Sequence, residues 1–491
     1  MFIIQKNFID RGGELNRKMN SGRLIFSLVL VLTLNCTSLF AQSNKFDVPD
    51  SSKIRASIKN SWLKNDFSSI RGKPTEERKN EIGINYQIRL EENEEFFKII
   101  VAPETLLDME YVCENGIVNR TVGVYLEGSS GSWVLQRNKK TGKPEKITWY
   151  FNADSDVYLQ IRPEDNRTVA DMVVFKSFIA RSVPVPSSFE NFYTCSFREL
   201  YNWTARSIPW NKVVPVPGQY HSILQMAAVI HEAHSRMDYI EDSCYDEDGK
   251  LCRISTGKGF KIGSETNEDI TAFYDNVKFN ADTSNKKRLA LSNAGFVKWV
   301  CDGLINPVEG KGTKISELLE ETMEINKTGR KGILSQNYNL TFTLDWCRNL
   351  AARIMSLNNS RDVTWLTGGV DVTLNFFSCE ITANGEIKNS SGYIKNTGYE
   401  ISKVKPMMYA LGVSEPGYFY LGAIKEVSKN KTETAFNKCA VFFPYFDDAG
   451  RFDCKVFEGG MEMSLESFVS RYPDSFVHLE RCKSSDYFFP Y

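Results

Sequence analysis

The chain has 491 residues, 42% of them hydrophobic and 25% charged, which is the composition of a globular protein. This composition excludes a disordered, collagen-like or polytopic membrane protein. The 60 Lys and Arg balance 61 Asp and Glu, so the net charge of −1 argues against a general nucleic-acid surface.

The first apolar segment, residues 24–34, reads LIFSLVLVLTL. Three basic residues precede it: Arg17, Lys18 and Arg23. The segment is too short to span a bilayer and is typical of a secretory signal. We therefore predict a signal peptide over residues 1–42, with cleavage near Ala41 and with Met19 as an alternative start.

The predicted signal places the mature protein in the periplasm or outside the cell. An alternative interpretation makes Cys36 the lipidated residue of a lipoprotein. The mature chain would then be attached to a membrane by its lipid, and in either case membrane association would be peripheral.

After the signal, residues 43–81 are polar and weakly patterned, and they are predicted to be a mobile lead. Strand signals dominate residues 82–182, for example in Phe96–Ala102 and Val157–Ile161. Several strands at short spacing predict an all-β, sandwich-like domain. Residues 183–220 begin with the stiff segment Val183-Pro-Val-Pro186 and are predicted to be a Pro-rich link and connecting segment.

Residues 221–491 combine both kinds of pattern. Helical spacing marks three segments: 221–236, 296–304 and 347–357. Strand signals mark four later ones: Val370–Leu374, Tyr418–Leu421, Ala440–Phe443 and Asp453–Phe457. Helices followed by strands predict an α+β domain.

Two charged clusters are candidate metal sites. His231 and His234 lie at HxxH spacing, but no third ligand stands at a known spacing, so a half-exposed helix face is the favoured interpretation. The acidic segment 241–249 lacks the ligand order of a calcium loop and is interpreted as a solvated turn. No metal and no cofactor is therefore predicted.

Ten cysteines follow the signal segment, without any CxxC pair. Cys244 and Cys252 flank the acidic turn and are candidates for pairing across a hairpin, although buried free thiols are an equal alternative. Cys301 and Cys347 lie on apolar helix faces and are interpreted as core or disulfide positions.

The segment Leu291–Val300 begins a predicted helix, for which Ser292 or Asn293 supplies the N-cap. A helix start favours negative charge, so a cysteine here would be a nucleophile with a lowered pKa. The sequence has Asn293 at this position instead. Asparagine does not form such an anion at neutral pH.

Asn293-Ala-Gly-Phe-Val297, followed by Trp299, resembles the Cys-Ser-Gly-Phe-Val signature of NlpC-type cell-wall cysteine peptidases, which are papain-like. The segment 438–443 is similar to the strand that begins with the family's catalytic His. The resemblance implies that Asn293 replaces the nucleophile and Lys438 the base. In a second register Tyr420 stands at the base position. The resemblance also implies a papain-like α+β domain over residues 221–491.

A papain-like domain would carry a groove beside the helix start. The groove candidates are Ser292, Ala294, Trp299, Trp346 and Tyr445. Because the nucleophile and the base are both replaced, catalysis by the family's mechanism is not expected.

We therefore expect a secreted envelope protein that binds cell-wall (peptidoglycan) peptides or an envelope protein without cleaving them. Two alternatives stay open. One is an active peptidoglycan endopeptidase with an unrecognised dyad, for which His478 is the first residue to inspect. The other is a structural surface protein in which the β domain is the working part.

Overall fold

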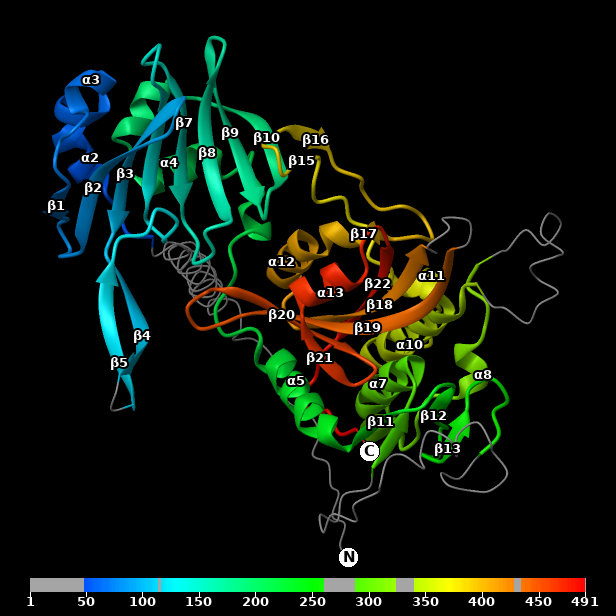
Figure 1. Ribbon diagram of the computed structural model, residues 1–491. Coiled ribbons are helices and arrows are strands. Elements are labelled where there is room, and N and C mark those ends of the chain that lie inside the picture. Colours follow the sequence, from blue (N-terminus) through cyan, green and yellow to red (C-terminus); the bar gives the residue numbers. More distant parts are fainter. Residues whose placement is uncertain (1–47, 114–115, 260–287, 324–339, 428–433, 491) are drawn as a thin grey trace, which may run out of the picture. The chain divides into compact units, whose positions relative to one another are not determined.

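The computed structural model describes residues 48–113, 116–259, 288–323, 340–427 and 434–490 (Figure 1). The predicted signal peptide over residues 1–42, the start at Met19 and the lipidation site Cys36 lie outside the described residues. The same holds for the first part of the predicted lead, residues 43–47.

Ten strands form one antiparallel sheet in the order β1-β2-β3-β6-β7-β8-β9-β10-β15-β16. Their bounds are β1 Glu76–Lys79, β2 Asn85–Glu92, β3 Phe96–Pro103, β6 Trp133–Asn138, β7 Pro144–Tyr150, β8 Val157–Glu164, β9 Arg167–Val174, β10 Ser177–Val185, β15 Cys379–Ile381 and β16 Ile387–Asn389. A separate hairpin, β4 Thr105–Cys113 with β5 Gly116–Val124, leaves this sheet after β3 (Figure 1).

Short helices cover one face of this sheet. They are α2 Ser52–Ile58, the π-helix η2 Lys59–Leu63, α3 Phe67–Ile70, the 3-10 helix η3 Phe189–Tyr193, α4 Phe197–Thr204 and the 3-10 helix η4 Trp210–Lys212. The guanidinium of Arg55 lies 5.1 Å from the ring centre of Trp133 and 5.3 Å from that of Trp149. It donates hydrogen bonds to the carbonyls of Tyr193 and Cys195. A buried cation on α2 thus joins the sheet to η3.

Two predictions for this region differ from the structure. Residues 82–182 were expected to form a sandwich of two sheets, but their strands, apart from the β4–β5 hairpin, join a single sheet. The spacing of strands along the sequence cannot distinguish a two-sheet sandwich from one sheet covered by helices. In both arrangements the same alternating residues of each strand are buried. The expected mobile lead contains α2, η2, α3 and β1, and Trp62 on η2 is fully buried.

Six strands form a second antiparallel sheet in the order β17-β22-β18-β19-β20-β21. Their bounds are β17 Tyr399–Glu400, β18 Tyr418–Val427, β19 Thr434–Phe446, β20 Phe452–Glu458, β21 Met461–Ser464 and β22 Phe476–Lys483. Successive side chains of a strand point to opposite faces. On one face of the sheet, Phe442 therefore packs on Phe468 of α13 (Leu465–Arg471). On the opposite face, Phe443 packs on Phe419 and Phe457.

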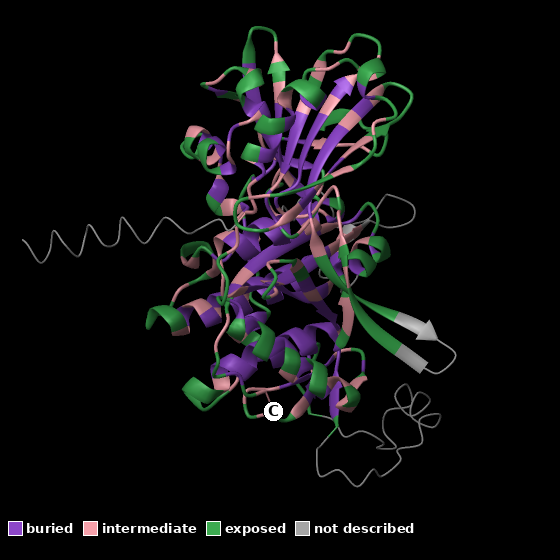
Figure 2. Ribbon diagram, turned by 90° about the vertical axis from the view of Figure 1, so that its left-hand side faces the viewer, coloured by how far each residue is buried: buried purple, intermediate pink, exposed green. Residues whose placement is uncertain are grey.

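Helices lie on both faces of the second sheet. The longest are α5 His221–Ala233, α7 Asn293–Glu309 and α10 Phe342–Asn359, which share one hydrophobic core with β18, β19 and β22. The other helices of this region are η5 His234–Arg236, α8 Ile315–Leu318, α11 Trp365–Gly368, η6 Ile401–Lys403, α12 Val404–Ser414 and α13 Leu465–Arg471. Most residues of α7 and α10 are buried, and Figure 2 shows buried residues gathered in the interior of the molecule with exposed ones around it.

The predicted papain-like α+β fold is wrong. The described chain is built mainly from the ten-stranded and six-stranded sheets, and no papain-like core is present among the described residues. The motif behind that prediction has a local cause. A Cβ on Gly295 would lie 2.1 Å from the carbonyl oxygen of Ser243 on β12 (Ser243–Tyr245), so α7 needs glycine where it crosses this strand.

The helices and strands predicted within residues 221–491 are present in the structure, except for one strand. The helices expected at 221–236, 296–304 and 347–357 correspond to α5 with η5, α7 and α10. The strands expected near 418, 440 and 453 correspond to β18, β19 and β20. Residues Val370–Leu374 form only an isolated bridge, from Asp371 to Glu480.

The remaining short strands form two pairs. β12 and β13 (Leu251–Arg253) make the hairpin around the acidic turn. β11 (Met237–Tyr239) and β14 (Leu289–Leu291) pair in parallel beside the start of α7.

Candidate functional site

The start of α7 is built as an N-cap, as the sequence predicted. The Ser292 hydroxyl accepts the N–H of Gly295 at 3.1 Å and donates to the carbonyl of Ser243 at 2.8 Å. Asn293, which is 9% exposed, donates through Nδ2 to Glu458 Oε1 at 3.4 Å. The same carboxylate is bound by Arg471 and Tyr472, so Asn293 belongs to a structural polar cluster.

The residues predicted to face Asn293 have other partners. Lys438 lies on β19, where its carbonyl accepts the hydroxyl of Thr343. Tyr420 is fully buried, and its hydroxyl donates to Glu415 at 2.9 Å. Within the described ranges, no hydrogen bond joins Asn293 to Lys438 or Tyr420. The two halves of the expected degenerate dyad are therefore not hydrogen-bonded to each other.

The predicted groove residues mostly belong to the core. Ala294 is 4% exposed, and its carbonyl accepts Trp346 Nε1–H at 2.9 Å. Trp299 is 2% exposed and stacks on Phe296. Tyr445 is half-buried and donates to Asp453. Buried side chains cannot contact a ligand, so this set does not support a groove at the start of α7.

The two charged clusters have structural partners. His231 binds Glu462, whereas His234 binds the carbonyl of Gly460, so the two imidazoles do not converge on one point. In the acidic turn, Asp246 accepts the N–H groups of Asp248 and Lys250. This supports the interpretation of the acidic segment as a turn.

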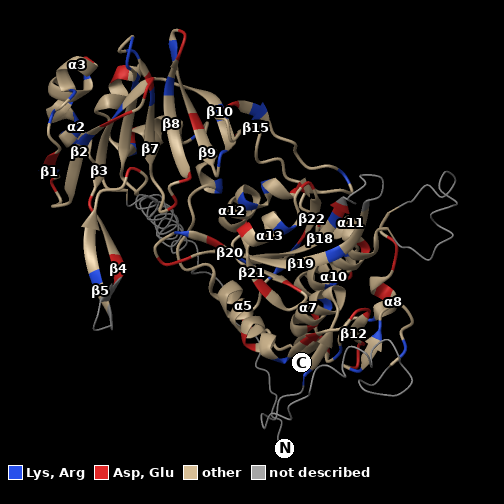
Figure 3. Cartoon of the chain, in the orientation of Figure 1, with Lys and Arg blue, Asp and Glu red and all other residues tan. Residues whose placement is uncertain are grey.

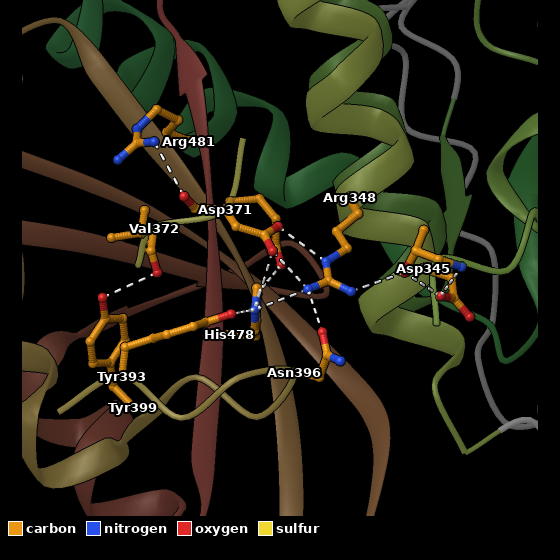
Figure 4. A network of polar contacts seen from close by, with 11 residues as sticks. Asp345, Arg348, Asp371, Val372, Tyr393, Asn396, Tyr399, His478 and Arg481 are labelled. Carbon is orange, nitrogen blue, oxygen red and sulfur yellow. Dashed lines mark hydrogen bonds and ion pairs between the residues drawn. The ribbon is translucent and has the colours of Figure 1, made fainter. Parts of the chain in front are cut away.

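His478 is the centre of a buried polar network (Figure 4). It lies on β22, where the strand alternation places His478, Glu480 and Cys482 on the face toward α10. Its Nδ1 is 2.6 Å from Glu480 Oε1, and its Nε2 is 3.0 Å from the hydroxyl of Tyr393. Arg348 of α10 lies 3.3 Å from the same Nε2.

Burial and the charge of Arg348 lower the pKa of His478 to about 3, so its imidazole is neutral at physiological pH. Because the guanidinium of Arg348 can only donate hydrogen bonds, Nε2 of His478 is the acceptor, and Nδ1–H of His478 donates to Glu480. Burial, followed by the nearby charge of Asp371, raises the pKa of Glu480 well above its ordinary value. His478 is therefore held as a neutral structural group.

Asp371, His478 and Glu480 place ligand atoms within 4.8 Å of one another, which is a spacing that a metal ion requires. Arg348 already fills the cation position. Its Nη2 lies 2.7 Å from Asp371 Oδ2 and 3.0 Å from Asn396 Oδ1, and its Nε lies 3.1 Å from Asp371 Oδ1. A metal ion would have to displace this bidentate pair, so the residues do not fit a metal site.

The outer side of Arg348 contacts an aromatic ring that reaches the surface. The guanidinium lies 4.4 Å from the ring centre of Trp365 on α11. Because Asp371, Asn396 and Thr322 fix the guanidinium, the half-buried Trp365 is held on a rigid base. The buried network thus positions one surface aromatic side chain.

Trp365 lines a cavity of about 450 Å³ between α8, α10 and α11. Asn349 of α10 donates to the carbonyls of Leu318 and Glu320, which holds the end of α8 against α10. Ser356 accepts the N–H of Val363 at 3.0 Å and closes the loop to α11. The described lining residues are Thr313, Glu317, Leu318, Glu320, Glu321, Asn349, Ala352, Arg353, Ser356, Asp362, Val363, Thr364 and Trp365.

Figure 3 marks acidic residues on and beside α8, one of the helices that supply the lining of this cavity. Four carboxylates line it: Glu317, Glu320, Glu321 and Asp362. Among the described lining residues the cation is Arg353, and it pairs with Glu309 and Asp362. Glu317 pairs with Lys314, so Glu320 and Glu321 supply the surplus of negative charge that favours a cationic group in the cavity.

Of these residues, His478 was recognisable in the sequence as a candidate, whereas Arg348, Asp371 and Trp365 were not. The available signal was the strand Val477-His-Leu-Glu480, in which two titratable residues alternate with apolar ones. Such a pattern indicates buried polar side chains on one face of a strand. Their partners, from α10, from the segment after α11 and from the loop before β17, carry no comparable signal.

Residues 44–212 match a family described as a domain of unknown function, DUF8515. The match spans the helices and strands from α2 to η4, and the second sheet and the acidic cavity lie beyond it. No curated protein and no solved structure matches the chain.

Across the described residues, no helix is both long enough and apolar enough to cross a membrane.

Proposed function

We propose that this protein is a non-catalytic binding protein whose acidic cavity takes a cationic peptide. The observation that carries the proposal is the cavity of about 450 Å³ whose lining includes four carboxylates and the fixed ring of Trp365. Its volume lies in the range of small-ligand sites. An aromatic surface beside negative charge suits an aliphatic chain that ends in an amine.

Cell-wall peptides that carry a free side-chain amine are the first ligand class to test. The predicted signal peptide would bring the protein into contact with them. The second ligand class is an envelope protein that presents a basic segment, because such a segment carries positive charge in the same way. Both would be recognised through the carboxylates of the cavity.

Binding without cleavage is supported by the state of the described thiols. All nine of them are buried, and burial raises the pKa of Cys301, Cys347 and Cys454 above the ordinary value. The hydrogen-bond partners of His478 are Glu480, Arg348 and Tyr393, so it is not poised beside a cysteine. A thiol peptidase needs an accessible thiolate and a base within reach.

The test is a calorimetric titration with muropeptides that have a free side-chain amine, beside the same peptides with that amine acetylated. We expect the free amine to bind and acetylation to abolish binding. Mass spectrometry of the titrated sample should recover intact peptide. Cleaved peptide would contradict the proposed absence of catalysis, and equal binding of the acetylated form would contradict the proposed recognition.

Glu317→Gln and Glu321→Gln each remove one lining charge and keep a similar shape. Because these carboxylates are exposed, we expect each substitution to weaken binding by about two- to fivefold, and added salt to reduce the difference. Glu386→Gln removes an exposed carboxylate outside the cavity and is the matched control. An equal loss in the control would show that overall charge, and not the cavity, governs binding.

A further inference from the structure

The ring of Trp365 has two faces, and one of them is already occupied by a cation. The guanidinium of Arg348 lies 4.4 Å from the ring centre. Arg348 is buried and bound by Asp371, so it stays on this face in the folded protein. A second cation on the opposite face would be attracted by the same π electrons. An apolar group is therefore the better neighbour for the free face of the ring.

An exposed leucine stands directly beside Trp365 on α11. This helix is a single turn, in which the Thr364 hydroxyl accepts the N–H of Thr367 at 3.4 Å. Successive residues of a helix are rotated by about 100° around its axis. While Trp365 faces Arg348, Leu366 remains in solvent and is 74% exposed. The α11 side of the cavity thus presents two apolar side chains on a fixed turn.

The surplus negative charge lies on the α8 side of the cavity. Glu320 and Glu321 follow α8 and take part in no ion pair among the described residues. Beside α11 the lining carboxylate is Asp362, and Arg353 lies 3.8 Å from it. The two sides therefore differ in chemistry: the α11 side is apolar, and the α8 side is negative.

We propose that the cavity binds a protein segment in which a large apolar residue stands next to a lysine or an arginine. The apolar side chain packs on Trp365 and Leu366, and the cation binds Glu320 and Glu321. Neighbouring residues of an extended segment point to opposite sides, which matches two sides of different chemistry. This assignment rests on the proposed function and selects one of its two ligand classes, the basic segment of an envelope protein.

The probe is a capped hexapeptide, Gly-Gly-Leu-Lys-Gly-Gly, titrated calorimetrically into the full chain. Two matched peptides have serine in place of the leucine or carry an acetylated lysine. We expect the leucine–lysine peptide to bind about five- to tenfold more tightly than the serine–lysine peptide, because burial of a leucine side chain is favourable. Acetylation of the lysine should abolish binding.

The outcomes separate the apolar contact from the proposed function. Equal affinity of the leucine–lysine and serine–lysine peptides would overturn the apolar contact and leave recognition of the amine intact. Equal affinity of the acetylated peptide would overturn recognition of the amine, and the proposed function with it. If none of the three peptides bound, the choice of a protein segment would be overturned, while the free-amine muropeptides would still test the proposed function.

Two substitutions of exposed leucines locate the contact. Leu366→Ser should reduce the affinity for the leucine–lysine peptide about five- to tenfold and leave the affinity for the serine–lysine peptide unchanged. Leu106→Ser is the matched control, because Leu106 is 69% exposed and lies on β4, outside the lining of the cavity. An equal loss in the control, or an equal loss for both peptides in Leu366→Ser, would overturn the contact.

Trp365→Leu tests which part of the ligand meets the ring. This substitution keeps an apolar side chain and removes the π electrons. Because Glu320 and Glu321 bind the amine in our assignment, we expect the affinity for the serine–lysine peptide to change by no more than about twofold. A loss of about tenfold or more would show that the amine stacks on the ring, and it would overturn the division of the cavity into an apolar and a negative side.

Discussion

At the scale of single residues, the buried network around His478 shows how a histidine can be used for structure. Its side chain is fully buried, and each ring nitrogen has a partner. Leaving such a group without a partner would cost free energy comparable to a lost hydrogen bond. Its neutral state makes the stability of the folded protein depend on pH.

Acid should destabilise the protein through His478. Its pKa is about 3 in the folded state and 6.5 ordinarily, so between these values the unfolded chain binds a proton that the folded chain excludes. Stability contributed by the neutral imidazole is therefore present above the ordinary pKa and is lost as pH falls. His478→Gln keeps an amide donor for Glu480 and removes this titration.

The measurement is urea unfolding of both proteins at about pH 7.5 and about pH 5. We expect the stability difference between wild type and His478→Gln to shift by about 2 kcal/mol against the wild type at the lower pH. A difference that is the same at both pH values would contradict the assignment of a neutral buried imidazole.

Residue-level prediction succeeded where the cause was local. Ser292 as the N-cap of α7 depends on neighbours within three residues, and the structure confirms it. The pairing of Arg348 with Asp371 depends on how α10 and a later segment meet at β22, which a single sequence does not specify. The acidic cavity was missed for the same reason, since α8, α10 and α11 supply its lining from separate segments.

At the scale of elements, the close crossing of α7 and β12 explains a glycine that suggested catalysis. Gly295 allows the backbone of α7 to approach the carbonyl of Ser243. The same carbonyl accepts the hydroxyl of the N-cap Ser292. Packing and capping therefore account for two residues of the peptidase-like segment without any role for a nucleophile.

Gly295→Ala should destabilise the protein. The added methyl group would lie 2.1 Å from a backbone oxygen that cannot move independently, so we expect a loss of about 2 to 3 kcal/mol in the free energy of unfolding. Gly412→Ala is the matched control, because Gly412 is also a buried helical glycine and its nearest neighbours lie at an ordinary 3.4 Å.

Denaturant unfolding of the two glycine variants gives the comparison. The control should change stability by about 1 kcal/mol or less, and alanine's better helix propensity favours a gain. Equal losses in both variants would contradict the close crossing of α7 and β12.

Element prediction followed hydrophobic periodicity and stopped at sheet assembly. The long helices and the main strands of the second half were found because each carries its own apolar pattern. Which strands share a sheet was not found. β15 and β16 lie in the first sheet although they stand between α11 and β17, which belong to the second half of the molecule. That choice is made by contacts between distant segments.

At the scale of the whole molecule, one carboxylate links the two sheets. Asp154, in the turn between β7 and β8, accepts the N–H of Phe452 at the start of β20 at 2.9 Å. Burial raises the pKa of Asp154 from 3.8 to about 6. The charged form is thus disfavoured in the folded protein.

A raised pKa means that the folded state holds this proton more tightly than the unfolded chain. The stabilising effect is complete at low pH and is lost as pH rises from about 4 to about 6. Asp154→Asn removes the ionisation and keeps an acceptor for Phe452. Because Asp154 is partly solvent-exposed, we expect this variant to gain only about 1 kcal/mol over the wild type above pH 6.

Urea unfolding near pH 4 and near pH 7 tests this expectation, with Asp156→Asn as the control for an exposed neighbour. The difference in stability between this control and the wild type should be the same at both pH values. A gain in Asp154→Asn that is equal near pH 4 and near pH 7 would contradict the raised pKa.

The pairing of β10 with β15 has a consequence for the order in which the protein is made. β10 ends at Val185, but β15, which pairs with its first residues Ser177 and Phe178, begins only at Cys379. A ribosome needs roughly ten to forty seconds to add the intervening residues. Throughout that interval the first sheet has an open edge of unpaired backbone groups, which can join a neighbouring nascent chain. A holding chaperone that shields this edge would therefore matter most while the middle of the chain is being synthesised.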